Sequence, residues 1–140
     1  MEIKFKKLNE SAVAPQYAHS FDAGMDLFCL ENISIAPNQR VQIATGIAME
    51  IPENFVGLIW DKSGLSHKSG LKIVGGVVDS QYRGGIKVGM INLSDETYNF
   101  EAGHKIAQML IQKVEQVNLI ESDSLSDTSR GEGGFGSTGK

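Results

Sequence analysis

The chain has 140 residues with a formal net charge of −4, and 41% of its residues are hydrophobic and 21% charged. This length suits one domain with its own hydrophobic core, and the acidic balance argues against a general nucleic-acid binder, which would carry a basic patch. A single cysteine, Cys29, excludes an internal disulfide and a cysteine-rich zinc site. No apolar run approaches the ~20 residues of a membrane span, and residues 1–7 lack the apolar stretch of a signal peptide, so we expect a cytoplasmic protein.

The hydrophobic pattern predicts short β-strands along most of the chain and little helix. The predicted strands are residues 33–35, 40–44, 47–51, 55–60, 73–74, 77–78 and 86–93. Residues 105–114 fit either a strand or a helix, and the preceding Gly103 and the nearby valines and isoleucines favour a strand. Many short strands at this spacing are typical of an all-β sandwich or barrel.

The composition changes after about Asn118. We therefore expect a β domain over residues 1–118, a flexible polar linker over 119–129 and a glycine-rich flap over 130–140. The flap offers groups that grip a nucleotide: the guanidinium fork of Arg130 for phosphate, the ring of Phe135 for a base, and the hydroxyls of Ser137 and Thr138. The composition of this tail alone would favour a disordered terminus.

Two glycine-containing segments are candidate binding loops. Asp61–Ser66 follows a predicted strand and places a cation, a hydroxyl and a glycine together, which suits phosphate oxygens, although this segment taken alone favours a plain polar turn. In Gly75–Gly85, two glycine pairs flank Asp79 and Tyr82. Asp79 follows a strand that we expect to be buried, where a carboxylate is costly unless it is paired or used. An ordinary aspartate in a hairpin turn is the alternative.

The remaining candidates for metal or acid–base chemistry are weaker. Asp22 and Asp26 lie four residues apart around Gly24, where a carboxylate could hold metal-bound waters or simply bond the backbone. The three histidines share no ligand spacing, and we interpret them as structural or solvated; they are His19, His67 and His104.

Five segments, in order along nearly the whole chain, resemble the five motifs of the trimeric dUTPase family, which cleaves dUTP to dUMP and pyrophosphate. They are Ala23–Leu27, Asp61–Leu65, Gly76–Gly84, Gly103–Gln108 and Arg130–Gly139. The resemblance implies a jelly-roll-like β fold and a homotrimer. It also implies active sites at the subunit interfaces, each drawing on three chains, and a role in limiting uracil in DNA and supplying dUMP for dTMP synthesis. Neither a nucleic acid nor a membrane is implied as a partner.

The resemblance also implies roles for single residues. Asp79 would be the general base that activates a water for attack on the α-phosphorus. Mg²⁺ would be held mainly by the triphosphate, with Asp26 reaching its waters. Lys62 would stabilise developing charge, and Tyr82 would pack on the deoxyribose and reject a 2′-hydroxyl. The other implied substrate-binding residues are Ser63, Gly64 and Gln108 for phosphates, Gly76, Val77, Val78 and Lys87 for the uracil edge, and Arg130, Phe135, Gly136, Ser137 and Thr138 in the flap.

The chain departs from the family pattern in the second and fourth motifs. The second usually reads Pro-Arg-Ser-Gly, and here it is Asp61-Lys62-Ser63-Gly64, so the charge stays but the guanidinium fork is lost. His104-Lys105 stands where Asp-Arg is usual, and Gln81 replaces a common acidic residue.

Three other hypotheses compete with this reading. A dCTP deaminase shares the fold but typically carries a glutamate after the aromatic of the third motif, where this chain has Arg83. A regulatory protein of the same fold would use nucleotide occupancy to control a partner. A structural β domain with a disordered tail would leave the five ordered motifs to chance.

Overall fold

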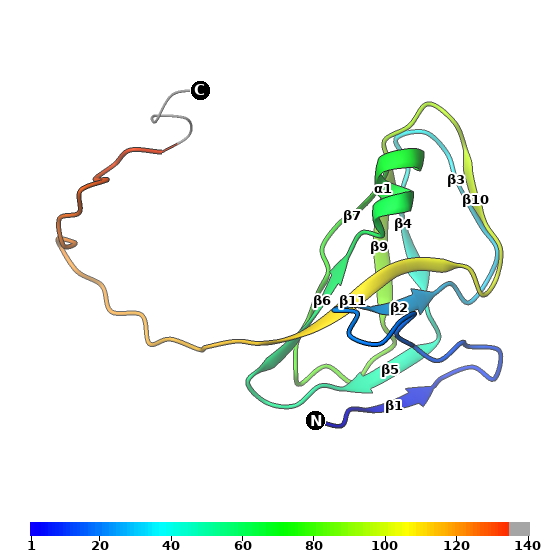
Figure 1. Ribbon diagram of the computed structural model, residues 1–140, viewed down its shortest axis with the longest axis horizontal. Coiled ribbons are helices and arrows are strands. Elements are labelled where there is room, and N and C mark those ends of the chain that lie inside the picture. The colour runs from blue at the N-terminus through cyan, green and yellow to red at the C-terminus, as the bar shows by residue number, and fades with distance from the viewer. Residues whose placement is uncertain (135–140) are drawn as a thin grey trace.

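The computed structural model describes residues 1–134, and in this part of the chain it contains eleven strands and one short helix (Figure 1). The strands are β1 (Lys4–Lys7), β2 (Met25–Phe28), β3 (Ile33–Ile35), β4 (Arg40–Ala44), β5 (Ile47–Glu50), β6 (Phe55–Trp60), β7 (Leu71–Ile73), β8 (Val77–Val78), β9 (Lys87–Asn92), β10 (Tyr98–Phe100) and β11 (Lys105–Lys113). The helix is α1 (Ser63–Ser69). The prediction of an all-β fold is confirmed.

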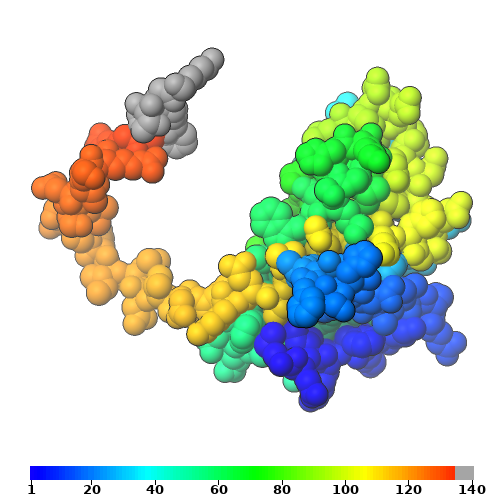
Figure 2. All heavy atoms as spheres, in the orientation of Figure 1, coloured from blue at the N-terminus to red at the C-terminus, as the bar shows by residue number. Residues whose placement is uncertain are grey.

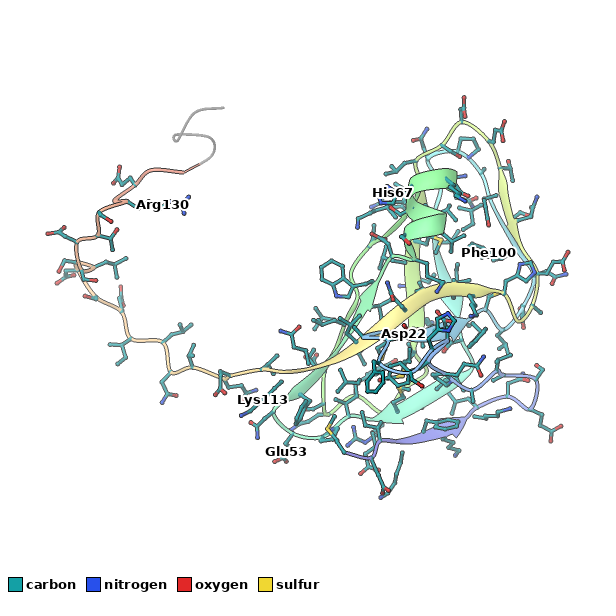
Figure 3. All side chains as sticks on the ribbon, viewed as in Figure 1. Asp22, Glu53, His67, Phe100, Lys113 and Arg130 are labelled. Carbon is teal, nitrogen blue, oxygen red and sulfur yellow. The ribbon has the colours of Figure 1, made fainter. Side chains whose placement is uncertain are left out.

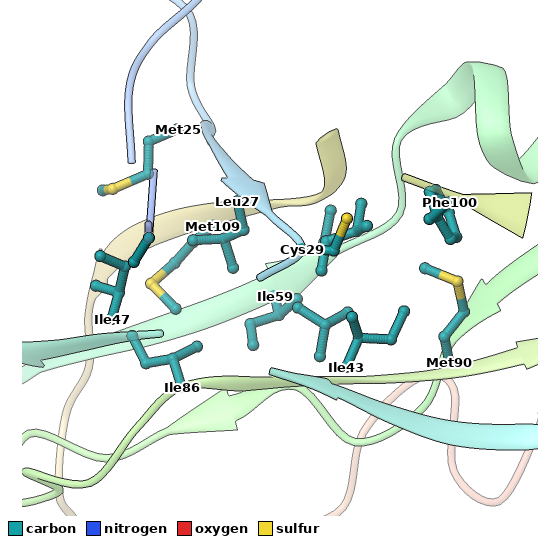
Figure 4. Close-up of a cluster of buried hydrophobic side chains, with 14 of the residues drawn as sticks. Met25, Leu27, Cys29, Ile43, Ile47, Ile59, Ile86, Met90, Phe100 and Met109 are labelled. Atoms are coloured by element: carbon teal, nitrogen blue, oxygen red, sulfur yellow. The ribbon is translucent and has the colours of Figure 1, made fainter. Parts of the chain in front are cut away.

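The strands form four antiparallel sheets. One has the order β2-β11-β6-β8 and another the order β4-β9-β7, while β1 pairs with β5 and β10 with β3. None of these sheets closes into a barrel within residues 1–134. The two larger sheets contribute to one core, which Figure 4 shows with side chains lying between the strands.

The core follows the period-two alternation of strands. Along β9, the side chains at Val88, Met90 and Asn92 are buried while those between them are not. From the opposite sheet, Leu27 and Met109 fill the same interior (Figure 4). Burying each such aliphatic side chain stabilises the fold by about 1.5–3 kcal/mol.

Four elements differ from the sequence-based expectation. β1, β2 and β10 were not predicted, and α1 occupies most of the segment that suggested a polar turn. β2 is buried at every position, so it shows no alternation. The helix ends because Gly70 adopts a left-handed conformation with φ of 64° and its N–H caps the last turn.

The C-terminal segment leaves the body after β11 ends at Lys113. Residues 114–134 contain neither strand nor helix, and they run away from the body (Figures 1 and 2). In the described part of the chain, no helix is long and apolar enough to cross a membrane.

Candidate functional site

The connection from β7 to β8 ends at a glycine, Gly76, that no other residue could replace without strain. Gly76 has φ of 105°, and a Cβ built there would lie 2.7 Å from the backbone oxygen of Ile59. The N–H of Ile59 donates a 2.7 Å hydrogen bond to the Gly76 carbonyl, so β8 is held tightly against β6. The turn that follows is thereby fixed to the main sheet.

The turn itself is closed by its own side chains. The hydroxyl of Tyr82 donates to the Gly85 carbonyl at 3.0 Å, and the Tyr82 N–H donates to the Asp79 carbonyl at 3.1 Å. Arg83 folds back and donates to the Ser80 and Tyr82 carbonyls at 2.5 and 3.0 Å. These bonds leave Asp79 and Tyr82 at the surface in a defined arrangement.

Asp79 and Tyr82 line a cavity of about 370 Å³. We call it the hairpin groove after the turn suggested by the sequence, although β8 and β9 belong to different sheets and do not pair with each other. It is lined by Gln42, Val77, Val78, Asp79, Tyr82, Gly85, Ile86 and Lys87. The expectation that Asp79 follows a buried strand is wrong, because β8 is an edge strand with Val77 67% exposed and Asp79 itself is exposed. Asp79 and Tyr82 also line a wider groove beside Phe55.

Gln42 was not selected from the sequence, yet it lines the hairpin groove. It lies on β4 opposite Gly89 of β9, and its neighbour Ile43 is buried in the core. Because strand side chains alternate, a buried Ile43 directs Gln42 to the outer face. The alternation of buried and exposed residues along β4 could have identified Gln42 as outward-facing. No local pattern indicated that β4 pairs with β9.

The two residues between β6 and α1 and the first two residues of α1 form a segment that we call the Asp61–Gly64 loop. It borders a second cavity of about 400 Å³, the loop groove. Its lining residues are Ala23, Trp60, Asp61, Ser63, Ser66, His67, Gln108 and Leu110. Gln108 donates from its amide nitrogen to the Asp61 carbonyl at 2.8 Å, which links β11 to the loop. A Cβ at Gly64 would meet no atom within 4 Å, so the loop is open there.

A buried carboxylate lies behind this loop. Asp26 on β2 is 2% exposed, and its two oxygens face Lys62 at 2.5 Å and Lys105 at 2.7 Å. Burial alone would raise the pKa of Asp26, but the two ammonium groups outweigh it and hold the pKa below its ordinary value. Asp26 therefore stays ionised and anchors both lysines.

Within one chain, the hairpin groove and the loop groove share no lining residue. Asp79, Tyr82 and Lys87 line the first, while Ser63 and Gln108 line the second. Gly76 borders neither, and Lys62 lies beneath the loop on Asp26.

Arg130 is exposed and donates to the Gly133 carbonyl at 2.7 Å, far from the body of the molecule (Figure 3). The other flap candidates, Phe135, Gly136, Ser137 and Thr138, lie outside the described residues. Among residues 1–134 no group of three or more histidines, cysteines or carboxylates is arranged to hold a metal ion.

The sequence resembles a known family along nearly its whole length. The sequence profile of the dUTPase family matches residues 10–139. A deoxyuridine 5′-triphosphate nucleotidohydrolase of Clostridium kluyveri is 48% identical over 141 residues, which cover 99% of each chain. The enzyme of the same name from Clostridium tetani is 46% identical over 140 residues, which cover 99% of this chain and 97% of the other.

Solved structures share the fold. The dUTPase of Staphylococcus bacteriophage 80alpha, with dUpNHpp, superposes with a TM-score of 0.94 at 30% identity over 99% of both chains. A variant of the dUTPase of phage phi11 of S. aureus, described as revealing the coordination of a structural Mg(II) ion, has a TM-score of 0.85 at 26% identity. That match covers 91% of this chain and 100% of the other.

Proposed function

The chain belongs to the dUTPase family, and from that premise we propose that it hydrolyses dUTP to dUMP and pyrophosphate. The full-length relationship to named nucleotidohydrolases carries this proposal. The reaction would limit uracil in DNA and supply dUMP for dTMP synthesis.

The hairpin groove suits the nucleoside half of the substrate. Its backbone groups at Val77, Val78 and Lys87 would read the edge of uracil, together with Gly76 at the base of the turn. The ring of Tyr82, fixed by its bond to the Gly85 carbonyl, would pack on the deoxyribose and leave no room for a 2′-hydroxyl. Asp79 would accept a proton from the water that attacks the α-phosphorus.

The loop groove suits the phosphate chain. Ser63, Gly64 and Gln108 would position phosphate oxygens, and Lys62 would stabilise the charge that develops in the transition state. Magnesium bound to the triphosphate would offset its negative charge. For Asp26 to reach the waters of that ion, its oxygens would have to serve the ion and the two lysines together.

The two grooves have different lining residues, and a smaller cavity contacts Asp61 of one and Val77 of the other; this division of the candidate residues underlies a proposal that the site is shared between subunits. No lining residue is common to them in one chain, so a homotrimer that brings the hairpin groove of one subunit to the loop groove of another would complete the site. The flap, from Arg130 through Phe135 to Thr138, would come from a third subunit. Its arginine would hold the γ-phosphate and its ring would stack on uracil.

The test is pyrophosphate release in the presence of Mg²⁺ from dUTP, dCTP, dTTP and UTP in parallel, with ammonia monitored in the dCTP reaction. Pyrophosphate from dUTP alone is the expected result, and EDTA should suppress it. Ammonia from dCTP would instead indicate a deaminase. If no reaction releases pyrophosphate or ammonia, the proposed activity is refuted and a nucleotide-dependent regulatory protein is favoured.

A further inference from the structure

Asp61 ties the Asp61–Gly64 loop to two strands at once. One carboxylate oxygen accepts a 2.6 Å hydrogen bond from the Ile73 N–H on β7, and the other pairs with the ammonium group of Lys72. The Asp61 carbonyl accepts from Gln108 on β11. Its side chain is 17% exposed, so these bonds are partly shielded from water.

This attachment fixes the two residues that follow Asp61. Lys62 and Ser63 come directly after it in the chain, and a residue held on both sides leaves them few alternative positions. Groups that must meet a phosphate within a fraction of an ångström lose much of their effect when the support is loosened. Asp61 is therefore one anchor of the loop, and the pairing of Lys62 with Asp26 is another.

Asp61 also places a negative charge where an anionic phosphate chain would bind. It lines the loop groove with Ser63, and together with Lys72 it lines a neighbouring cavity of about 220 Å³ that reaches Gly76 at the base of the hairpin. Two like charges this close repel each other unless a cation intervenes. Lys72, whose side chain is 49% exposed, supplies that cation.

We propose that Asp61 is a positioning residue for the phosphate-binding loop, and that Lys72 is required to neutralise it beside the bound triphosphate. This inference rests on the proposed dUTP hydrolysis. The Asp61 side chain acts in two ways. Its hydrogen bond to the Ile73 N–H holds the loop in position, and its negative charge does not repel the triphosphate because Lys72 neutralises it.

Four variants separate these contributions: Asp61→Asn, Asp61→Ala, Lys72→Met and the double variant Asp61→Asn with Lys72→Met. Each is compared with the wild type by steady-state hydrolysis of dUTP and by calorimetric binding of dUMP and of dUpNHpp with Mg²⁺. Only dUpNHpp carries the β- and γ-phosphates. A loop defect therefore weakens dUpNHpp and leaves dUMP unchanged, whereas general damage weakens both. Thermal melting and size-exclusion chromatography check the fold and assembly of each variant.

We expect Asp61→Ala to lower kcat/KM and dUpNHpp affinity by about 10-fold or more, with dUMP affinity within about twofold of the wild type. Asp61→Asn keeps an acceptor for the Ile73 N–H and should retain most activity. Lys72→Met leaves the carboxylate unpaired and should weaken dUpNHpp by about 3–10-fold. The double variant, which has no charge at either position, should recover most of that loss.

Several outcomes would overturn the inference. Unchanged kinetics in Asp61→Ala, or equal losses for dUMP and dUpNHpp, would refute the positioning role. A double variant no better than Lys72→Met would refute the neutralising role. If Asp61→Ala fails to fold, the other three variants still show whether Lys72 is needed to neutralise Asp61. Asp61→Asn then shows whether an uncharged hydrogen-bond acceptor at this position is enough to hold the loop. A wild-type chain that releases no pyrophosphate from dUTP would defeat the proposed function instead.

Discussion

Lys62, beside the loop groove, donates a 2.5 Å hydrogen bond to the buried carboxylate of Asp26 on β2. Lys105 of β11 lies 2.7 Å from the other carboxylate oxygen, so one aspartate holds two lysines that come from different parts of the chain. We expect Asp26→Asn, which keeps the shape but removes the charge, to lower the free energy of unfolding by about 2 kcal/mol at neutral pH. The expected loss of stability is moderate because both lysines are partly exposed.

The stabilisation by Asp26 depends on pH in a defined direction. Because its pKa is lower in the folded protein, the stabilisation is full above the ordinary value of 3.8 and disappears as the pH falls from there through the folded pKa. Urea unfolding of the wild type and of Asp26→Asn, at one protein concentration, should show that the difference between their free energies of unfolding disappears below that pH. Asp123→Asn, in the exposed tail, is the control, and its free energy of unfolding should equal that of the wild type at every pH. If the difference between the wild type and Asp26→Asn stays constant or grows in acid, Asp26 is not stabilised by its ion pairs with Lys62 and Lys105.

Lys62 is expected to matter for catalysis more than for the fold. Removing its charge with Lys62→Met should lower kcat by about 10²–10³-fold, because a preorganised cation near the developing charge would be lost. Lys68→Met is a matched control, since Lys68 is exposed on the short helix that follows Lys62 and lines neither groove. Equal kinetic effects from the two substitutions would show that net charge, rather than the position of Lys62, is responsible.

Local patterns predicted most of the strands but missed β2, whose burial on both faces is decided by distant parts of the chain. β9 alternates and was predicted, whereas β2 is buried on both faces and was not. The pairing of Asp26 with Lys62 joins residues 36 positions apart, and no local pattern encodes it. Single-chain motifs predicted which residues are candidates for the site, while their division between two grooves depends on the assembled sheets.

Asp79→Asn should abolish turnover and spare binding. The substitution keeps the size of the side chain, so the hairpin groove is preserved, but an amide cannot take a proton from the attacking water. We expect kcat to fall by about 10²–10⁴-fold while dUpNHpp affinity stays within a few-fold of the wild type. Asp95→Asn, on an exposed turn after β9, controls for loss of one surface carboxylate. Near-normal kcat in Asp79→Asn would mean that another group is the base.

Gly76 tests whether the connection from β7 to β8 needs a residue that tolerates a positive φ. A Cβ there would lie 2.7 Å from the Ile59 carbonyl oxygen, and φ of 105° is unfavourable for any other residue. Gly76→Ala should therefore cost about 1–3 kcal/mol and move β8 away from β6, with dUMP affinity falling as the hairpin groove distorts.

Gly64 provides the contrast, because a Cβ at that position meets no atom within 4 Å and its φ lies outside the left-handed region. Gly64→Ala should leave stability unchanged or raise it, since alanine favours the helix that begins there by up to about 1 kcal/mol. If Gly64 lies against a phosphate, the added methyl group should nevertheless weaken dUpNHpp and spare dUMP. Urea unfolding and calorimetry of both variants separate a glycine required by the backbone from one required by the ligand. Equal destabilisation by the two substitutions would refute that distinction.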